Sequence, residues 1–480
     1  MLPSAGGTLV PATSAGSNAC GRRAVGTPAE LAGCIKLSAL WSELTQFQNI
    51  ANANKIQGHG YRDTFTPGYE ASVDYVAARM QSAGYKVTIQ RFPLTIHQPD
   101  GTAEFRTASR SYALEREWFV ARGSGSGTIA AKIEPPRGSA TGCAASDFAG
   151  FARGRVALLE AGSCAADAQV ANAQAAGARA AVLYAGEGPP HIARLFERVD
   201  IPVVGVASNA IGEELLGQYR SGIAPDVYVR VRTRSYTGID ANVIADSPYG
   251  DPNHTVVIEG HLDSIFGAGM LDNASGSTTI LDVALNLAKT PTRNHLRYVW
   301  FGGEELGLFG SRYYTKHLAP ANLHRIAFDM DVDVTATPNF DILIADPAYA
   351  TNVGRFPHNV VPKSRVGNAY FAGYFNAGGV ISQPARFGND GTDSNSFSLA
   401  GVPNTGVLTN QDCCKHVWET NLWGGFRGNY EGRIPSFNGG CVDRPNRWCD
   451  NLSNNDRFVF ELMSRAVAYV TFELANDASL

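Results

Sequence analysis

Residues 254–289 read HTVVIEGHLDSIFGAGMLDNASGSTTILDVALNLAK, residues 295–318 read HLRYVWFGGEELGLFGSRYYTKHL, and residues 325–334 read RIAFDMDVDV. Apolar, β-branched and aromatic runs within these stretches predict three buried strands, at Val256–Glu259, Leu296–Gly302 and Ile326–Val332. Two helical patterns separate the strands, Ser275–Lys289 and Gly307–His317. Strands that alternate with helices predict an α/β fold with a mixed, mostly parallel central sheet and helices on both of its faces.

Side chains of the types that bind metals accompany each predicted strand: His261 and Asp263, then Glu304 and Glu305, then Asp329 and Asp331. In open α/β sheets, functional sites form at the carboxyl ends of the strands. Carboxylates gathered at one edge of a sheet repel each other unless a cation lies among them. The stretch therefore predicts a metal centre.

Each candidate also has a purely structural interpretation. A carboxylate commonly orients a histidine ligand, as His261 with Asp263 would allow, but a single histidine at a strand end is more often structural. Asp272 precedes a helix and is also a candidate helix cap. The helix dipole favours acids at a helix start, which explains one of Glu304 and Glu305 better than both. An Asp inside an apolar strand is rare unless paired or ligated, so we expect Asp329 to be a ligand.

The whole chain has 480 residues, enough for about three domains of ~150 residues each. A hydrophobic content of 44% and a charged content of 18% are typical of a globular protein. The net charge of −4 and the lack of a basic run give no reason to expect nucleic acid as a partner. No apolar stretch approaches the ~20 residues that span a bilayer.

The chain contains eight cysteines, at positions 20, 34, 143, 164, 413, 414, 441 and 449. Their even number and the absence of a paired zinc-knuckle spacing favour disulfides in an exported protein, extracellular or periplasmic. Reduced, buried cysteines in a cytosolic enzyme are the alternative. Residues 1–19 lack the charged start and apolar core of a signal peptide, so an exported protein would begin here after its signal.

Changes in composition divide the chain. Residues 1–35, rich in small residues, are interpreted as an N-terminal extension that a Cys20–Cys34 bridge would staple. Residues 36–118 and 236–480 form one discontinuous domain. Residues 119–235, rich in Ala and Gly, are interpreted as an inserted β/α domain with its own core.

The order HLDS, LDNASG, FGGEELGLFGS and FDM resembles the di-zinc aminopeptidases of metallopeptidase family 28, of the secreted bacterial leucyl-aminopeptidase type. PGYEASVDYVAARMQSAGYKVTIQRF and the tail CDNLSNND are similar to other parts of that family. The insert resembles a protease-associated (PA) domain, through Cys143, Asp147-Phe148, Gly162-Ser163-Cys164 and GARAAVLY. The resemblance covers most of the chain beyond about residue 36.

The resemblance implies a zinc-dependent exopeptidase that binds two Zn²⁺ per chain. His261 and Asp329 would hold one zinc, Glu305 and a C-terminal histidine the other, and Asp272 would bridge the two. Glu304 would be the general base on the attacking water, and Asp263 would orient His261. His416, beside Cys413, Cys414 and Lys415, is preferred over His358 as the last ligand.

Three features depart from the family pattern. Lys415 stands where many members have Tyr, and it would either supply positive charge or point to solvent. Thr392-Asp393-Ser394 replaces a common Ser-Asp-His, and Gly391 a common Arg, which puts the anchor of the substrate amine in doubt. Residues 417–448 are an aromatic-rich insertion, either a self-packed loop or an apolar wall of the substrate cleft.

The family's cysteines imply a Cys414–Cys449 bridge, and Cys143 and Cys164 fall together in the insert. The remaining cysteines would then form the Cys413–Cys441 and Cys20–Cys34 disulfides. The expected substrates are peptide or protein N-termini, with a preference for apolar residues, and a monomer is expected. The alternatives are a carboxypeptidase or dipeptidase on the same scaffold, for which Arg386 is the nearest carboxylate-binding candidate, and a non-catalytic binding protein.

Overall fold

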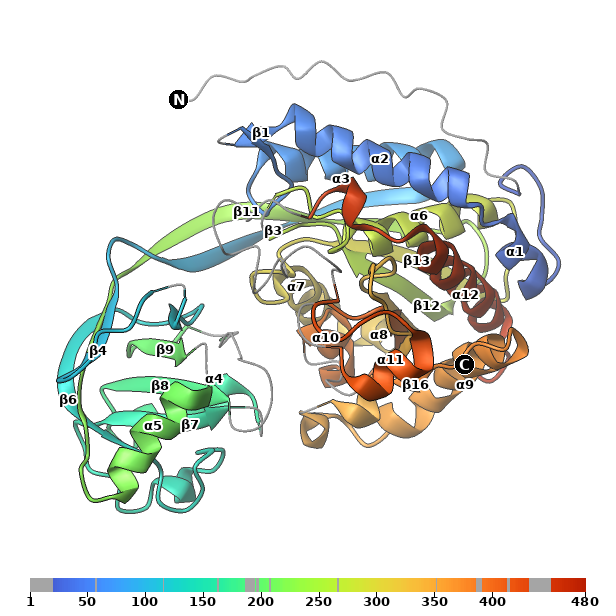
Figure 1. The fold of residues 1–480 in the computed structure, drawn as a ribbon. Helices are drawn as coiled ribbons and strands as arrows, with labels where there is room; N and C mark the ends of the chain where they lie inside the picture. The colour runs from blue at the N-terminus through green and yellow to red at the C-terminus, as the bar shows by residue number, and fades with distance from the viewer. Residues whose placement is uncertain are drawn as a thin grey trace.

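The computed structural model describes residues 20–480 except 57, 115, 162–163, 186–194, 196–197, 207–208, 266, 351, 386–390, 412–414 and 431–449. Two large sheets dominate this part of the chain, one in each of two bodies joined by a pair of long strands (Figure 1). Among the described residues, no helix combines the length and apolarity that crossing a membrane requires.

The larger sheet has eight strands in the order β16-β15-β17-β14-β12-β13-β11-β3. Their bounds are β3 (Lys86–Pro99), β11 (Thr233–Asp246), β12 (Asp251–His261), β13 (Asn294–Phe301), β14 (Ile326–Val332), β15 (Leu343–Ala345), β16 (Gln383–Pro384) and β17 (Asn404–Leu408). The four central strands β13, β12, β14 and β17 are parallel, whereas β11 and β15 pair antiparallel to their inner neighbours. The predicted mixed, mostly parallel sheet is confirmed.

Helices cover both faces of this sheet, as predicted. One face packs against α1 (Pro28–Cys34), α2 (Leu37–Ala53), α3 (Pro67–Ala83), α6 (Ala274–Leu287), α9 (Val360–Ala377) and α12 (Arg457–Asn476). The other face packs against α7 (Phe309–His317), α8 (Pro320–Leu323) and α10 (Ser394–Leu399). Every side chain of α6 is buried, which makes it the central helix of the first face.

In strand β14, apolar residues and acids alternate, so they lie on opposite faces of the sheet. Because successive side chains of a strand point to opposite faces, Phe328, Met330 and Val332 enter the core shared with α6 and α12. By the same alternation the acids Asp329 and Asp331 point to the face that α7 and α10 cover. The pattern FDMDVD thus places apolar residues on one side of the sheet and carboxylates on the other.

The smaller body contains a seven-stranded sheet in the order β4-β10-β6-β7-β8-β9-β5. Its elements are β4 (Glu104–Thr107), β5 (Trp118–Val120), β6 (Gly127–Glu134), β7 (Val156–Ala161), α4 (Ala166–Ala175), β8 (Ala180–Ala185), β9 (Val203–Val206), α5 (Asn209–Arg220) and β10 (Asp226–Val231). Strand β4 pairs with β10, so this sheet begins 15 residues before the predicted boundary at 119. The strands β3 and β11, paired along their whole length, lead into it (Figure 1).

The short elements are β1 (Lys55–Ile56), β2 (His59–Gly60), α11 (Val417–Trp423) and 3₁₀ turns at Ala145–Phe148, Pro347–Tyr349, Val353–Arg355 and Leu452–Asn454. The N-terminal segment is not a separate extension from Cys20 onward, because Val25, Leu31 and Ile35 lie in the main core. The Cys20–Cys34 and Cys143–Cys164 disulfides are both present, as predicted. The other two predicted bridges involve cysteines outside the described residues.

Candidate metal centre

His261 ends β12 and meets two carboxylates at the carboxyl edge of the sheet. Its Nε2 atom lies 2.9 Å from Oδ1 of Asp272 and 3.4 Å from Oδ1 of Asp333. One ligand-type atom from each of these residues lies within 4.8 Å of the others. An imidazole and two carboxylates at such spacing are a donor set of the kind that zinc takes in proteins.

Asp329, the predicted partner of His261, lies too early on the neighbouring strand β14 to be opposite His261. The ladder between β12 and β14 pairs Val257 with Asp329 and Glu259 with Asp331. Continued by two residues, this register sets Asp333, and not Asp329, opposite His261. Asp329 lies four residues earlier, about 13 Å along the strand at ~3.3 Å per residue. The predicted pairing of His261 with Asp329 is therefore corrected to His261 with Asp333.

Asp263 connects the histidine to the turn after β13. His261 Nδ1 lies 3.0 Å from the Asp263 carbonyl oxygen and 3.6 Å from its carboxylate, so the main chain makes the closer contact with the ring. The two carboxylate oxygens accept hydrogen bonds from the backbone N–H groups of Glu304 and Glu305, at 3.2 and 3.3 Å. One residue thus orders both the imidazole and the glutamate turn.

Glu304 and Glu305 follow β13 and are both buried. Oε2 of Glu304 lies 3.9 Å from His261 Nε2, close to the cluster but outside its three-residue group. The main-chain carbonyl of Glu305 accepts a hydrogen bond from the Arg122 guanidinium, which comes from the smaller body. The inserted domain therefore touches the candidate site directly.

The electrostatics of the cluster favour a cation. Burial alone would lower the pKa of His261, but Asp333, Asp263 and Asp272 outweigh it and hold that pKa well above its ordinary value. Burial and the charge of Asp333 also raise the pKa of Asp331 to about 6. Buried carboxylates are stable when they are paired or bind metals. The residues present therefore fit a divalent metal ion.

Two buried residues that the sequence did not single out hold the segment 262–272 in place. The Asp450 carboxylate accepts hydrogen bonds from the backbone N–H groups of Leu271 and Asp272, at 2.8 and 3.1 Å. The Arg62 guanidinium donates to the carbonyl oxygens of Leu262, Ala268 and Gly269, at 2.7–2.8 Å. The Asp272–Asn273 peptide bond is cis. These contacts position Asp272 beside His261.

Asp333 has a support of its own. The Thr392 hydroxyl lies 2.8 Å from Oδ2 of Asp331 and 3.1 Å from Oδ2 of Asp333. Thr392 belongs to the Thr-Asp-Ser segment that departs from the family pattern. Its hydroxyl thus contacts the carboxylates of both Asp331 and Asp333.

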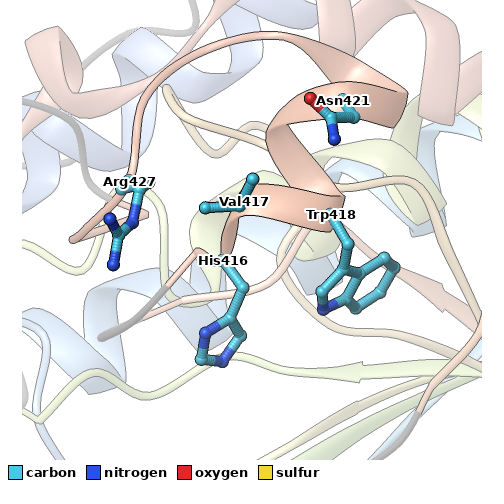
Figure 2. Close-up of a pocket in the computed structure, with 5 residues that line it drawn as sticks. All are labelled: His416, Val417, Trp418, Asn421 and Arg427. Atoms are coloured by element: carbon cyan, nitrogen blue, oxygen red, sulfur yellow. The ribbon is translucent and has the colours of Figure 1, made fainter.

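His416 is not part of the three-residue cluster. It immediately precedes α11, and it lines a pocket together with Val417, Trp418, Asn421 and Arg427 (Figure 2). The metal-type group found among the described residues includes neither His416 nor Glu305. His358, the rejected alternative, is exposed, and Arg386 lies outside the described residues.

Lys415 neither points to solvent nor joins the cluster. Only 2% of it is exposed, and its Nζ lies 3.4 Å from Oδ1 of the buried Asp341. It also donates to the Phe340 carbonyl oxygen. Lys415 therefore anchors the segment that carries His416.

The sheet, with an imidazole and carboxylates gathered at its carboxyl edge, defines an α/β protein with a candidate metal centre, a class that includes metallohydrolases. The sequence profile of peptidase family M28 matches residues 242–430, and that of the PA domain matches residues 126–215. An aminopeptidase of Pseudomonas aeruginosa is 31% identical over 93% of this chain and 82% of its own length. The chain belongs to peptidase family M28 and is a metallo-aminopeptidase with an inserted PA domain.

Other relatives extend over similar lengths. A probable lipoprotein aminopeptidase of Mycobacterium tuberculosis is 29% identical over 92% of this chain and 86% of its own. Leucine aminopeptidase 2 of Arthroderma otae is 26% identical over 93% and 86%. The fold is similar to that of an aminopeptidase from Aneurinibacillus sp. strain AM-1, with a TM-score of 0.68 at 20% identity over 94% of this chain and 97% of the other.

Proposed function

We propose that this aminopeptidase uses two zinc ions and a glutamate base to remove N-terminal residues from peptides, with a preference for apolar residues. The observation that carries the proposal is the convergence of His261, Asp272 and Asp333 within 4.8 Å at the carboxyl edge of the sheet. A solved structure of similar fold, with a TM-score of 0.57 at 20% identity over 93% of this chain and 97% of the other, is a zinc aminopeptidase from Bacillus subtilis.

The proposed ligand set differs from the sequence-based one at a single position. His261 and Asp333 hold one zinc, Glu305 and His416 hold the other, and Asp272 is shared between them. When bound, zinc supplies Lewis acidity that polarises a carbonyl and lowers the pKa of water. The carboxylates around His261 supply the negative charge that two divalent cations require.

Glu304 acts as the general base. Its Oε2 atom lies 3.9 Å from His261 Nε2, which places the carboxylate beside the proposed metal ligands, where the attacking water would be. Glu304 takes the proton of the attacking water and returns it to the leaving amine. Asp263 is a positioning residue, because its backbone and carboxylate order both His261 and the Glu304–Glu305 turn.

Two observations support the apolar preference. Val417 and Trp418 present apolar surface in the pocket beside His416 (Figure 2). The Arthroderma otae relative is named a leucine aminopeptidase. An apolar side chain of the substrate would bury its surface against this indole, which stabilises binding through the hydrophobic effect.

An oxidising compartment, extracellular or periplasmic, is proposed as the location. The two disulfides support it, because structural disulfides are rare in reducing cytosol. The Mycobacterium tuberculosis relative is named a lipoprotein. The proposed partners are peptide or protein N-termini.

The decisive experiment compares leucyl-nitroanilide with its N-blocked form and with a C-terminally free, N-blocked peptide, before and after chelation. We expect hydrolysis of the N-free substrate alone, loss of activity on chelation, and recovery with zinc. Activity that survives exhaustive chelation, or that is confined to N-blocked substrates, would contradict the proposal.

A matched pair of variants separates the roles of the two glutamates. E304Q is expected to retain bound zinc and lose most turnover, whereas E305Q is expected to bind less zinc. Metal content measured by atomic emission beside kcat distinguishes them. Loss of zinc in E304Q with retention in E305Q would exchange the two roles.

A further inference from the structure

The pocket beside His416 combines apolar surface with one permanent cation. It has a volume of about 570 Å³ and is lined by His416, Val417, Trp418, Asn421 and Arg427 (Figure 2). This volume lies within the range of typical ligand pockets. An apolar preference accounts for Val417 and Trp418, but it gives no role to a guanidinium.

The segment that carries Arg427 is tied down by one buried side chain. Nδ2 of Asn339 donates to the carbonyl oxygens of Phe426 and Asn429 at 2.8 and 3.0 Å, and Oδ1 of Asn339 accepts from the Phe426 N–H at 3.1 Å. Gly425 has φ +79°, and a Cβ on it would lie 2.1 Å from Asn339 Oδ1. The backbone on either side of Arg427 is therefore held firmly.

A second tie joins this segment to the residue before His416. The backbone N–H of Lys415 donates to the Gly428 carbonyl oxygen at 2.7 Å, and the Gly428 N–H donates back to Lys415 at 3.2 Å. Arg427 and His416 thus stand on two paired pieces of chain. Figure 2 shows His416 below Val417 and Arg427 to the left of both.

Arg427 is exposed and forms no ion pair with any acid among the described residues. A guanidinium on a fixed backbone binds a carboxylate through two parallel hydrogen bonds, and it loses less entropy than a cation on a mobile loop. The pocket is therefore complementary to a ligand with an apolar body and a carboxylate.

The pocket also lies on the side of the sheet where the candidate metal centre is. His416 follows β17, whose parallel neighbour is β14, and Asn339 is six residues beyond Asp333. Both loops leave the carboxyl ends of their strands. A peptide whose N-terminal residue lies at the metal centre can extend toward these loops.

We propose that this pocket binds a carboxylate of the substrate at Arg427. An apolar side chain of the same substrate, next to that carboxylate, packs against Val417 and Trp418. The favoured substrates are short peptides whose second residue carries a carboxylate, either the free C-terminus of a dipeptide or an acidic side chain. The inference rests on the proposed aminopeptidase function and narrows its substrate class.

Three substrates test it in the wild-type enzyme. Leu-Leu has a C-terminal carboxylate, Leu-Glu-amide has only a side-chain carboxylate, and Leu-Leu-amide has neither. We expect a KM at least about tenfold lower for one or both carboxylate substrates than for Leu-Leu-amide, the scale of one charge-assisted contact. The substrate that has the lower KM shows whether the pocket binds the C-terminal carboxylate or the side-chain carboxylate.

Variants then assign the effect to Arg427. R427A is expected to remove the KM difference, by raising the KM of the carboxylate substrates to that of Leu-Leu-amide, and R427K is expected to keep part of the difference. R325A, at the amino end of β14 on the opposite edge of the sheet, is the matched control and should keep all of it.

The outcomes separate this inference from the function on which it rests. Equal KM values for the three substrates in the wild-type enzyme, or a difference that persists in R427A, would overturn the assignment of the pocket alone. If none of the three substrates is hydrolysed, the aminopeptidase proposal would be overturned as well. The comparison in the wild-type enzyme holds even where R427A does not fold.

Discussion

Asp333 Oδ1 lies 3.4 Å from His261 Nε2, and the strand register sets Asp329 four residues away from that contact. Asp329 and Asp331 share one face of β14 by the alternation of the strand, and Asp333, the first residue after β14, continues that alternation at the edge of the sheet. Asp329 and Asp331 are instead buried in a group with Glu259 and Asp393, and burial, followed by the charges of neighbouring acids, raises the pKa values of Glu259, Asp329 and Asp393. The two ends of the same acidic run therefore have different roles.

Replacing each acid by its amide separates these roles. D333N is expected to lower zinc affinity by about ten- to a hundredfold or more, because it removes the charge of a proposed ligand. D329N is expected to keep its zinc, since Asp329 lies about 13 Å from the level of His261. Titration of the apoproteins with zinc and a competing chelator measures both. Zinc loss in D329N with normal affinity in D333N would restore the original assignment.

The buried pair of Lys415 and Asp341 gives a second prediction. Because both side chains are almost fully buried, K415M leaves an uncompensated carboxylate and should lower the free energy of unfolding by about 3–5 kcal/mol. The double variant K415M/D341N should recover part of that loss, since it removes the orphaned charge. Urea unfolding followed by tryptophan fluorescence measures each.

The exposed K363M is the control for side-chain replacement as such and should unfold like the wild type. A loss in the free energy of unfolding of K415M/D341N that equals the sum of the losses of K415M and D341N measured singly would mean that the two residues act independently. In that case the segment before His416 would be anchored by the carbonyl contacts of Lys415 alone.

The contact of Arg122 with the Glu305 carbonyl predicts that the inserted domain affects catalysis. R122A is expected to lower kcat/KM by roughly ten- to a hundredfold, because a small displacement of the glutamate turn misplaces catalytic groups. R116A, an exposed arginine of the same region, is the control. Steady-state kinetics with leucyl-nitroanilide measure both variants, and equal values for R122A and R116A would show that the contact has no catalytic role.

Local pattern was sufficient to predict the central sheet and its helices. The alternation in IAFDMDVDV and the apolar run before Glu304 predict strands whose ends carry the chemistry, and β12, β13 and β14 confirm them. The assignment of Asp329 came from its burial in an apolar strand and from the resemblance of FDM to the family pattern. The rule that sites lie at strand ends, applied to the last acid of the alternation, indicates Asp333.

Other features depend on contacts between distant parts of the chain, which no local pattern encodes. Arg62 and Asp450 support the segment around Asp272 across more than 170 residues of sequence. The buried Lys415 contacts Asp341 and the carbonyl oxygen of Phe340, which lie far from it in sequence. The early start of the smaller sheet depends on the pairing of β4 with β10, which are far apart in sequence.

Asp282 lies in the middle of α6, fully buried, and neither of its carboxylate oxygens has a hydrogen-bond partner among the described residues. Burial, and then the nearby charge of Glu43, raise the pKa of Asp282 to about 8, although Arg79 opposes the shift. An unfolded chain has this group near its ordinary pKa of ~3.9. Between these two values the folded state holds a proton that the unfolded state has released.

This difference in bound protons determines whether the stability of the folded protein rises or falls with pH. Where the native state binds more protons, stability falls as pH rises, so Asp282 should cost stability progressively from about pH 4 to about pH 8. D282N cannot ionise, and its Tm should therefore exceed that of the wild type by an amount that grows between pH 4.5 and pH 7.5. Thermal unfolding at several pH values measures the difference, with D226N, an exposed aspartate of β10, as the control. A Tm difference between D282N and wild type that stays constant over this range would mean that Asp282 is already ionised in the folded protein.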